Sequence, residues 1–199
     1  SNATSSLGID KLTVTGGTYQ ALLGESNIRE YILHNPKLKL SILPASPDLA
    51  GAEVELVNEV GREHLLKRKL LPLADDFDYI LIDCPPSLGL LTLNGLVAGV
   101  NGILIPVQCE YLAMEGLGDL ISTIDRVQRV ISPDLIIRGV ILTMFDTRTN
   151  LANDVVNEVR KHFKDQVFNT FVPRSVRLAE APSYGIPISL YSPGSVGAK

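Results

Sequence analysis

Short apolar runs alternate along the chain with longer segments whose apolar residues recur at helical spacing. The short runs are 38–43, 78–82, 102–107, 135–144, 167–172 and 186–190. Strands that are covered on both faces by crossover helices have this continuous apolar character, whereas half-exposed strands alternate. The pattern therefore predicts an α/β protein with a doubly wound, mostly parallel sheet and helices on both faces.

The longer segments carry apolar residues three or four positions apart and are predicted to be helices. They are 49–65, 91–98, 114–130 and 151–163. In the last segment Val155, Val159 and Phe163 stand four apart, which places them on one helical face. In the first, Glu53, Glu59 and Glu63 are expected on the polar face. The apolar stripes are interpreted as core.

The 199 residues, 45% of them apolar, are enough for one sizeable core, so residues 4–199 are expected to form a single partial nucleotide-binding domain of the type identified below. Ser1, Asn2 and Ala3 resemble the remnant of a cleaved tag. The formal net charge of -4 provides no global attraction to nucleic acid or to an anionic membrane, so any DNA contact requires a local basic patch. No apolar stretch reaches the length of a membrane span.

The cysteines and histidines show no pattern of a metal site. Cys84 and Cys109 each lie beside an apolar run and are expected to be buried free thiols, which suits a reducing cytoplasm. His34, His64 and His162 lack metal-ligand spacing and are expected on helix faces or the surface.

Asp83 ends the apolar run 78–82, at the place where α/β sheets bind ligands. In nucleotide hydrolases an aspartate at this position is the Walker B acid, which orders magnesium and its waters near the phosphates. The alternative interpretation is that Asp83 caps the following turn through its own side chain. The residue type and position alone leave both open.

The segment around Asp83 resembles a known family. Asp-Cys-Pro-Pro-Ser at 83–87, followed by Leu-Thr-Leu-Asn at 91–94, is similar to the Walker B and switch segment of the ParA/Soj/MinD group of deviant-Walker ATPases. Further segments agree in order and are 43–49, 106–117, 143–149 and 173–185. The chain is thereby identified as a member of the ParA/Soj family. It is closer to chromosomal Soj than to MinD, since no terminal membrane-binding helix is apparent.

The resemblance implies a P-loop NTPase-like fold and an ATPase that takes part in chromosome or plasmid segregation. Its cofactors would be ATP and Mg²⁺. Its partners would be nonspecific DNA, a ParB/Spo0J-type protein and a second copy in an ATP-dependent homodimer, with no membrane, in the cytoplasm at the nucleoid.

The resemblance also transfers roles to six residues of this sequence. Asp83 would act in catalysis and hold Mg²⁺ through water. Met144, Pro173 and Arg174 would bind the nucleotide at its adenine end, although Met144 and Pro173 could equally be packing residues. Arg148 and Arg177 would contact DNA phosphates.

The basic and acidic residues around these positions leave alternatives open. Arg148 and Arg177 could instead be solvated residues paired with Asp146 and Glu180. A further set could extend the basic patch or form an ordinary solvated face: Arg160, Lys161 and Lys164. Another set matches a family loop near the dimer face, with no chemical role assigned: Gln108, Glu110 and Glu115.

The family's glycine-rich loop ending in Lys-Thr-Thr, whose amides and lysine neutralise phosphates, is not found in the 199 residues. Residues 2–10 match the segment after the family's second strand, and the family's closing helix is not found either. We therefore expect an N-terminally truncated chain that binds ATP poorly and does not hydrolyse it. The sheet would close up in an altered order or borrow a strand, from residues 11–16 or from another copy.

Three other functions remain open. A cobyrinic acid diamide synthase-type ligase shares the superfamily but requires a glutaminase domain with a nucleophilic cysteine. An iron–sulfur protein related to the nitrogenase iron protein requires closely placed cluster cysteines. The chain could also be a nucleotide-free adaptor that binds a partner through the same surface.

Overall fold

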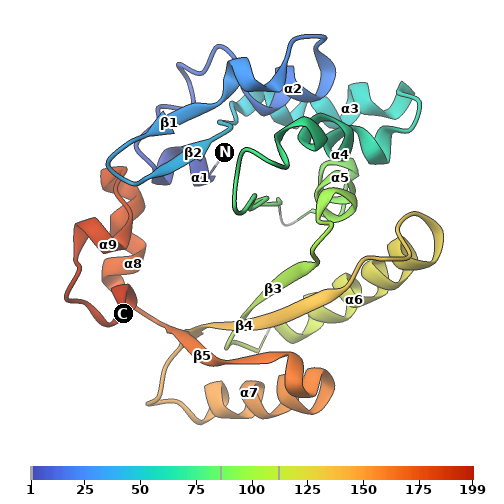
Figure 1. The fold of residues 1–199 in the computed structure, drawn as a ribbon. Helices are drawn as coiled ribbons and strands as arrows, with labels where there is room; N and C mark the ends of the chain where they lie inside the picture. The colour runs from blue at the N-terminus through green and yellow to red at the C-terminus, as the bar shows by residue number, and fades with distance from the viewer. Residues whose placement is uncertain (1, 86, 112) are drawn as a thin grey trace. The chain divides into compact units, whose positions relative to one another are not determined.

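A computed structural model describes residues 2–85, 87–111 and 113–199, without the side chains of 113–115. The chain forms two compact units (Figure 1). The first comprises Ser1–Ala98 and Ala181–Pro187, and the second comprises Gly99–Glu180 and Ile188–Lys199.

The second unit contains a parallel three-stranded sheet in the order β3-β4-β5. The strands are β3 (Ile103–Gln108), β4 (Ile137–Phe145) and β5 (Val167–Pro173), and Val107 of β3 lies beside Leu142 of β4. Two long helices connect them: α6 (Ala113–Val130) and α7 (Asn150–Phe163). The structure thus confirms the α/β class and the parallel pairing of these strands.

The core of this unit lies between the sheet and these two helices (Figure 1). Its buried side chains are Val107, Val140 and Leu142 from the sheet, Ile124 and Val127 from α6, and Val155, Val159 and Phe163 from α7. The predicted stripe of α7 is therefore core, except for Leu151, which is exposed. Thr149 caps this helix by accepting a hydrogen bond from the Ala152 N–H (3.4 Å). The short elements of this unit are η6 (Lys164–Gln166), α8 (Val176–Glu180), α9 (Ile188–Tyr191) and η8 (Val196–Ala198).

The first unit is built from short helices and an antiparallel ribbon. Its α-helices are α1 (Asn2–Ser6), α2 (Thr18–Leu23), α3 (Ala52–Glu55), α4 (Leu65–Leu70) and α5 (Leu90–Ala98). Its ribbon pairs β1 (Leu33–Asn35) with β2 (Leu40–Ile42). Its 3₁₀ turns are η1 (Ile28–Tyr31), η2 (Pro47–Ala50), η3 (Leu56–Asn58), η4 (Arg62–His64), η5 (Leu71–Leu73) and η7 (Ala181–Tyr184). One buried cluster joins α2, α3, α4 and α5 and contains Leu22, Ala52, Leu56, Leu65, Leu66 and Ala98.

Two predictions in this unit are wrong in detail. The run 38–43 forms a strand only over β2, and it pairs antiparallel with the unpredicted β1 instead of joining the parallel sheet. The helix predicted over 49–65 is divided into short turns. Gly61 adopts a left-handed φ of +64°, which an uninterrupted helix excludes, and the adjoining Val60 is 90% exposed.

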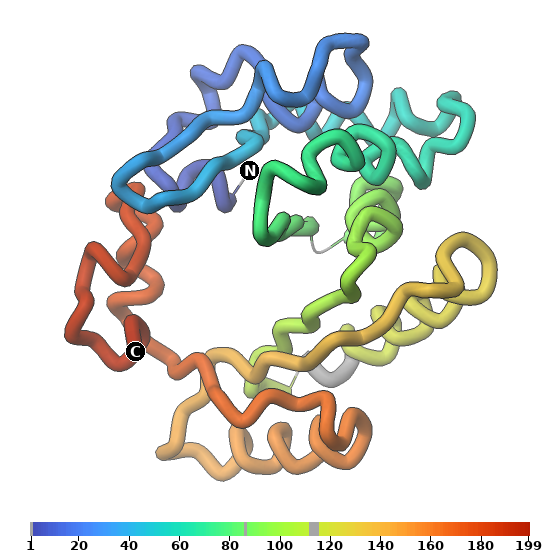
Figure 2. Tube along the Cα trace, viewed as in Figure 1, coloured from blue at the N-terminus to red at the C-terminus, as the bar shows by residue number. Residues whose placement is uncertain are grey.

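The run 78–82 was predicted to be a strand and is not one. Its backbone can be followed as part of the chain trace in Figure 2. A strand exists only through its ladder partner, and within the described residues no strand pairs with this run. Tyr79 and Leu81 are each 86% exposed as a result. Pro86, in the segment 83–87 that carries the family resemblance, lies outside the described residues.

Two further strand expectations are also wrong. The run 186–190 instead contains helix α9, because Pro187 fits just before a first helical turn and Ser192 N–H bonds to the Ile188 carbonyl (2.9 Å). Residues 11–16 supply no strand, since Asp10 binds the Leu12 N–H (3.0 Å) and folds the segment into a turn.

Candidate functional site

The three parallel strands of the second unit end at one edge of their sheet. Backbone hydrogen bonds join the strand ends: Cys109 N–H donates to the Thr143 carbonyl (2.9 Å), and Arg174 N–H donates to the Phe145 carbonyl (2.9 Å). Parallel α/β sheets bind their ligands beyond this carboxyl edge. The structure thus brings the ends of β3, β4 and β5 together where a ligand site is expected.

Charged side chains connect these strand ends. Arg174, after β5, forms an ion pair with Glu110, after β3. Arg148 donates two hydrogen bonds to Asp146, which follows β4: Nε to Oδ1 (2.9 Å) and Nη2 to Oδ2 (2.7 Å). These hydrogen bonds, and secondarily the charge of Arg174, hold the pKa of Asp146 well below its ordinary value. The carboxyl edge therefore presents two arginines whose acidic partners are already in place.

Met144 and Pro173, the two positions predicted to flank adenine, end adjacent strands at this edge. Met144 is 37% exposed and adopts a left-handed φ of +54°, which is uncommon for a residue other than glycine. Strained backbone of this kind is often found at ligand sites. The neighbouring Phe145 ring stacks on Phe171 with centroids 4.6 Å apart, which fixes the end of β4 on β5.

Arg177 lies on α8 and pairs with Glu180 (2.9 Å), whose carboxylate also accepts a bond from the Tyr191 hydroxyl (3.2 Å). The Glu180 and Tyr191 contacts raise the pKa of Arg177. Both arginines predicted to bind DNA thus occupy the acid pairs named by the alternative interpretation. Both guanidinium groups are largely exposed, so solvent screens these pairs and a phosphate could replace the carboxylate at little cost.

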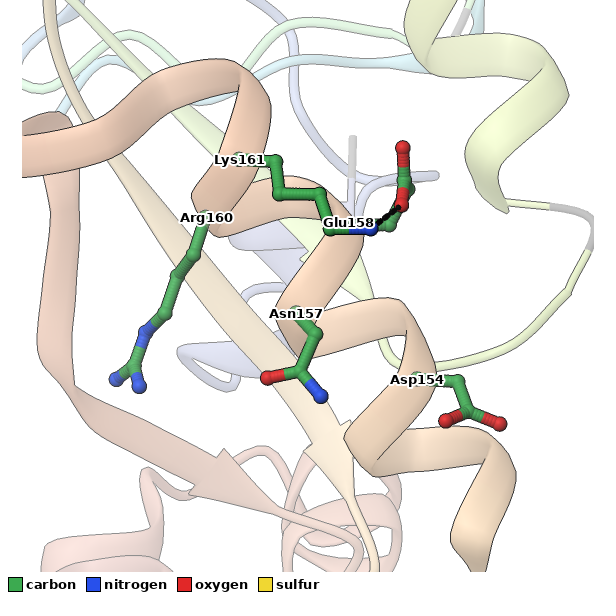
Figure 3. A pocket seen from close by; sticks show the side chains of 5 residues that line it. All are labelled: Asp154, Asn157, Glu158, Arg160 and Lys161. Carbon is green, nitrogen blue, oxygen red and sulfur yellow. Dashed lines mark hydrogen bonds and ion pairs between the residues drawn. The ribbon is translucent and has the colours of Figure 1, made fainter.

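Basic residues of α7 lie beside acidic ones (Figure 3). Asp154, Asn157, Glu158, Arg160 and Lys161 line an open depression of about 630 Å³. Lys161 pairs with Glu158 (2.9 Å), and Arg160 lies over the Phe171 ring, 5.5 Å from its centroid. This helix face has mixed charge, which favours the solvated-face interpretation over an extension of the basic patch.

Asp83 belongs to the first unit and is exposed. Within the described residues its carboxylate makes no hydrogen bond or ion pair, so turn capping finds no support there. It lines a cavity of about 600 Å³ together with Thr18, Ser46, Glu53 and Asn94. Asn94, part of the switch-like segment, is buried and structural: its side chain bonds Leu66 N–H (3.0 Å) and two carbonyls.

Asp83 alone would provide too few ligands to hold Mg²⁺ without a nucleotide. No cluster of three or more His, Cys, Asp or Glu residues that could hold a metal occurs in 2–85, 87–111 or 113–199. Mg²⁺ in nucleotide sites is typically held by one or two carboxylates together with phosphates and water. Asp83 alone suits such an ion if a nucleotide supplies the other ligands.

The two cysteines differ in exposure. Cys109 is buried, and burial raises the pKa of its thiol. Cys84 is exposed, contrary to the prediction, because the run before it forms no strand, although its Sγ lies against Gly95 of α5. Burial of this sulfur, and secondarily the Asp83 charge, raise the pKa of the Cys84 thiol. Both thiols are free.

Sequence reasoning missed Glu53. It was expected on a polar helix face, but its Oε1 is buried and has no hydrogen-bond partner in the described part of the chain. Its place over Gly89 depends on the packing of α3 beside the start of α5, which the apolar spacing does not reveal. No helix of the described chain is long and apolar enough to cross a membrane.

Comparison with known proteins gives consistent results. A family model described as an AAA domain matches residues 1–137. The chain is 55% identical over 199 residues to the chromosome partitioning protein ParA of Myxococcus xanthus, covering all of this chain and 70% of that protein. It is 50% identical over 198 residues to the sporulation initiation inhibitor protein Soj of Bacillus subtilis, covering 78% of that protein.

Solved structures share the fold. A crystal structure of cobyrinic acid a,c-diamide synthase from Mycobacterium smegmatis, with bound ADP and magnesium, is 40% identical with a TM-score of 0.80, over 92% of this chain and 73% of that one. The cell division ATPase MinD of Pyrococcus furiosus is 24% identical with a TM-score of 0.71, over 99% of this chain and 76% of that one. The second likeness supports the fold alone.

Proposed function

The chain belongs to the ParA/Soj family of chromosome-partitioning ATPases, and we propose that it acts in an ATP-switched protein that binds DNA without sequence preference. The observation that carries this proposal is the meeting of Met144, Arg148 and Arg174 at the carboxyl edge of the β3-β4-β5 sheet. That edge offers an apolar surface and two guanidinium groups in one place. A planar base and phosphates are the ligands that such a set suits.

In this proposal Met144 and Pro173 flank the adenine ring, and Arg174 is held beside them by its bond to Phe145 and its pair with Glu110. Asp83 holds the waters of Mg²⁺. The bound ion would supply positive charge that neutralises the phosphates. The similar synthase that holds ADP and magnesium supports this choice of cofactors.

Arg148 and Arg177 are assigned to DNA phosphates because their side chains are 84% and 59% exposed and their pairs are easily exchanged. Phosphate contacts carry no base information, which agrees with binding that is indifferent to sequence. A ParB/Spo0J-type protein, an ATP-dependent homodimer and a place in the cytoplasm on the nucleoid complete the proposal.

The experiment that tests the catalytic part is a chimera in which this chain replaces the matching segment of the Bacillus subtilis relative. We expect Mg²⁺-dependent ATP hydrolysis by the chimera and a loss of about tenfold or more with Asp83→Ala, measured as phosphate release. Asp75→Ala, which removes another exposed aspartate of the first unit, is the matched control. Unchanged turnover with Asp83→Ala would contradict the catalytic role of Asp83 and favour the turn-capping interpretation.

The 199-residue chain alone is expected to release no phosphate above a protein-free blank. Its sequence contains no glycine-rich segment with the lysine and hydroxyl that bind the phosphates. Sustained release by the isolated chain would contradict this part of the proposal.

The likeness to cobyrinic acid a,c-diamide synthase at 40% identity favours a second candidate, an ATP-dependent amide-forming ligase. One assay of the chimera distinguishes the ligase function from the partitioning function. Glutamine-dependent consumption of ATP in the absence of DNA would favour the ligase, whereas ATP-dependent retention on DNA favours the partitioning function.

A further inference from the structure

The carboxylate of Glu53, on α3, lies directly over the Cα of Gly89, the residue before α5. A Cβ placed on Gly89 would lie 2.7 Å from Glu53 Cδ and 3.0 Å from Oε2, and closer still to Oε1. Gly89 is not among the residues with positive φ, so its backbone would accept an alanine. A side chain at position 89 would therefore displace the Glu53 carboxylate from its place over Gly89.

Glu53 Oε1 is buried and accepts no hydrogen bond from any described residue. An uncompensated buried carboxylate is unfavourable. Its surroundings offer one compensation: Leu93 N–H bonds to the Gly89 carbonyl (3.0 Å), so the amides before it open α5 without helical partners. The start of a helix carries partial positive charge, which favours a carboxylate there.

The segment that carries Asp83 is held on the same helix. Cys84 Sγ is the nearest atom to the position of a Cβ on Gly95. The Thr92 hydroxyl donates to the carbonyl of Ser87 and lies 3.3 Å from that of Pro85. Residues 84, 85 and 87–89 thus lie along α5 between Gly95 and its first turn, where the Glu53 carboxylate lies.

We propose that Glu53 is a positioning residue for residues 83–85 and 87–89: its carboxylate holds the first turn of α5 and thereby the place of Asp83. The two glycine contacts and the Thr92 bonds join this segment to α5. The Glu53 carboxylate adds a polar contact from α3, beside the buried apolar cluster that already joins α3 and α5. That Glu53 thereby affects magnesium binding at Asp83 rests on the proposed function. That Glu53 positions this segment on α5 does not.

Cys84 gives a direct readout that needs no nucleotide. Its alkylation rate by iodoacetamide, assigned by mass spectrometry, reports how firmly Cys84 lies on Gly95. The buried Cys109 reports opening of the second unit in the same sample. Glu53→Ala is expected to raise the Cys84 rate about fivefold or more while the Cys109 rate stays within twofold. Glu53→Gln keeps the shape of the side chain and removes its charge. Its Cys84 alkylation rate is expected to lie between those of the unchanged chain and of Glu53→Ala.

Glu55→Ala on the same helix is the matched control, since Glu55 accepts a hydrogen bond from the Tyr19 hydroxyl (2.7 Å) and its atoms are not among the three nearest to the position of a Cβ on Gly89. Its Cys84 rate should stay within twofold of the unchanged chain. A Glu53→Ala rate also within twofold would overturn the proposal. A Glu53→Gln rate equal to that of the unchanged chain would overturn its electrostatic part.

A second measurement covers the case in which Glu53→Ala does not fold. Gly89→Ala should lower the urea midpoint when Glu53 is present and lower it much less beside Glu53→Ser, because the smaller side chain leaves room for the Cβ. Equal losses in both backgrounds would show that Glu53 does not occupy the space over Gly89. Neither the alkylation rates nor the urea midpoints depend on ATP binding or hydrolysis. The positioning role of Glu53 and the proposed ATPase function can therefore be refuted independently of each other.

Discussion

Asp146 accepts three hydrogen bonds from Arg148, two from the guanidinium and one from its backbone N–H (3.0 Å). A carboxylate bonded in this way is ionised at lower pH when folded than when unfolded. Its contribution to stability is thus present above the ordinary pKa of 3.8 and is lost as the pH falls towards the lower folded value.

The first prediction rests on the direction of that shift. Asp146→Asn should lower the urea midpoint at pH 7, and the difference from the unchanged chain should shrink as the pH falls below about 4. The effect should be small, because Arg148 is largely exposed. Urea titrations at pH 7, 5 and 3 measure it, with Asp154→Asn on α7 as the control. A difference that grows towards low pH would contradict the assignment.

At the scale of elements, α1 is fixed to the turn η7 of the same unit by a contact between two glycines. Gly8 and Gly185 both have left-handed φ, of +78° and +63°, and a Cβ on Gly8 would lie 2.8 Å from the Gly185 carbonyl oxygen. The buried Thr4 hydroxyl of α1 also accepts a bond from Ala45 N–H (2.9 Å). The N-terminal helix is thus held at two points.

Gly8→Ala should therefore destabilise the chain by at least about 1 kcal/mol, since alanine is strained at this φ and its Cβ meets backbone. Gly194→Ala is the matched control, because nothing lies within 4 Å of its Cβ position. Chemical unfolding of both variants measures the difference. Equal stability of the two variants would mean that α1 does not dock through Gly8.

The elements also show what the sequence pattern could predict. The α7 stripe and the apolar runs of β3, β4 and β5 are local signals, and the structure confirms these elements. The run 78–82 has an equally strong local signal, but a strand depends on a distant partner. Helix α9 was missed because Pro187 was read as part of an extended run and not as a helix start.

The candidate site was predictable to a similar extent. The apolar runs 135–144 and 167–172 place Met144 and Arg174 near strand ends, while their choice as site residues came from the family resemblance. The pair of Arg174 with Glu110, 64 positions apart, has no local signal. The buried Oε1 of Glu53 depends on the packing of α3 against α5. The roles of Asp83, Arg148 and Arg177 remain predictions.

For the whole molecule, the exposed extended run around Tyr79 and Leu81 presents unpaired backbone and apolar side chains. Such segments pair with other chains. We expect concentration-dependent self-association of the 199-residue chain, measured by light scattering, which Leu81→Lys reduces. Val60→Lys, at an equally exposed valine outside this run, should leave it unchanged. A stable monomer across the concentration range would contradict strand exchange.

The central claim is tested most directly by DNA binding of the chimera. With ATP and Mg²⁺ it should shift duplexes of unrelated sequence equally, and the affinity should fall steeply with salt. Arg148→Ala with Arg177→Ala should abolish the shift while ATP binding persists, whereas Arg129→Ala with Arg138→Ala, two exposed arginines elsewhere in the second unit, should not. A normal, ATP-dependent shift by the Arg148 and Arg177 double variant would contradict the account.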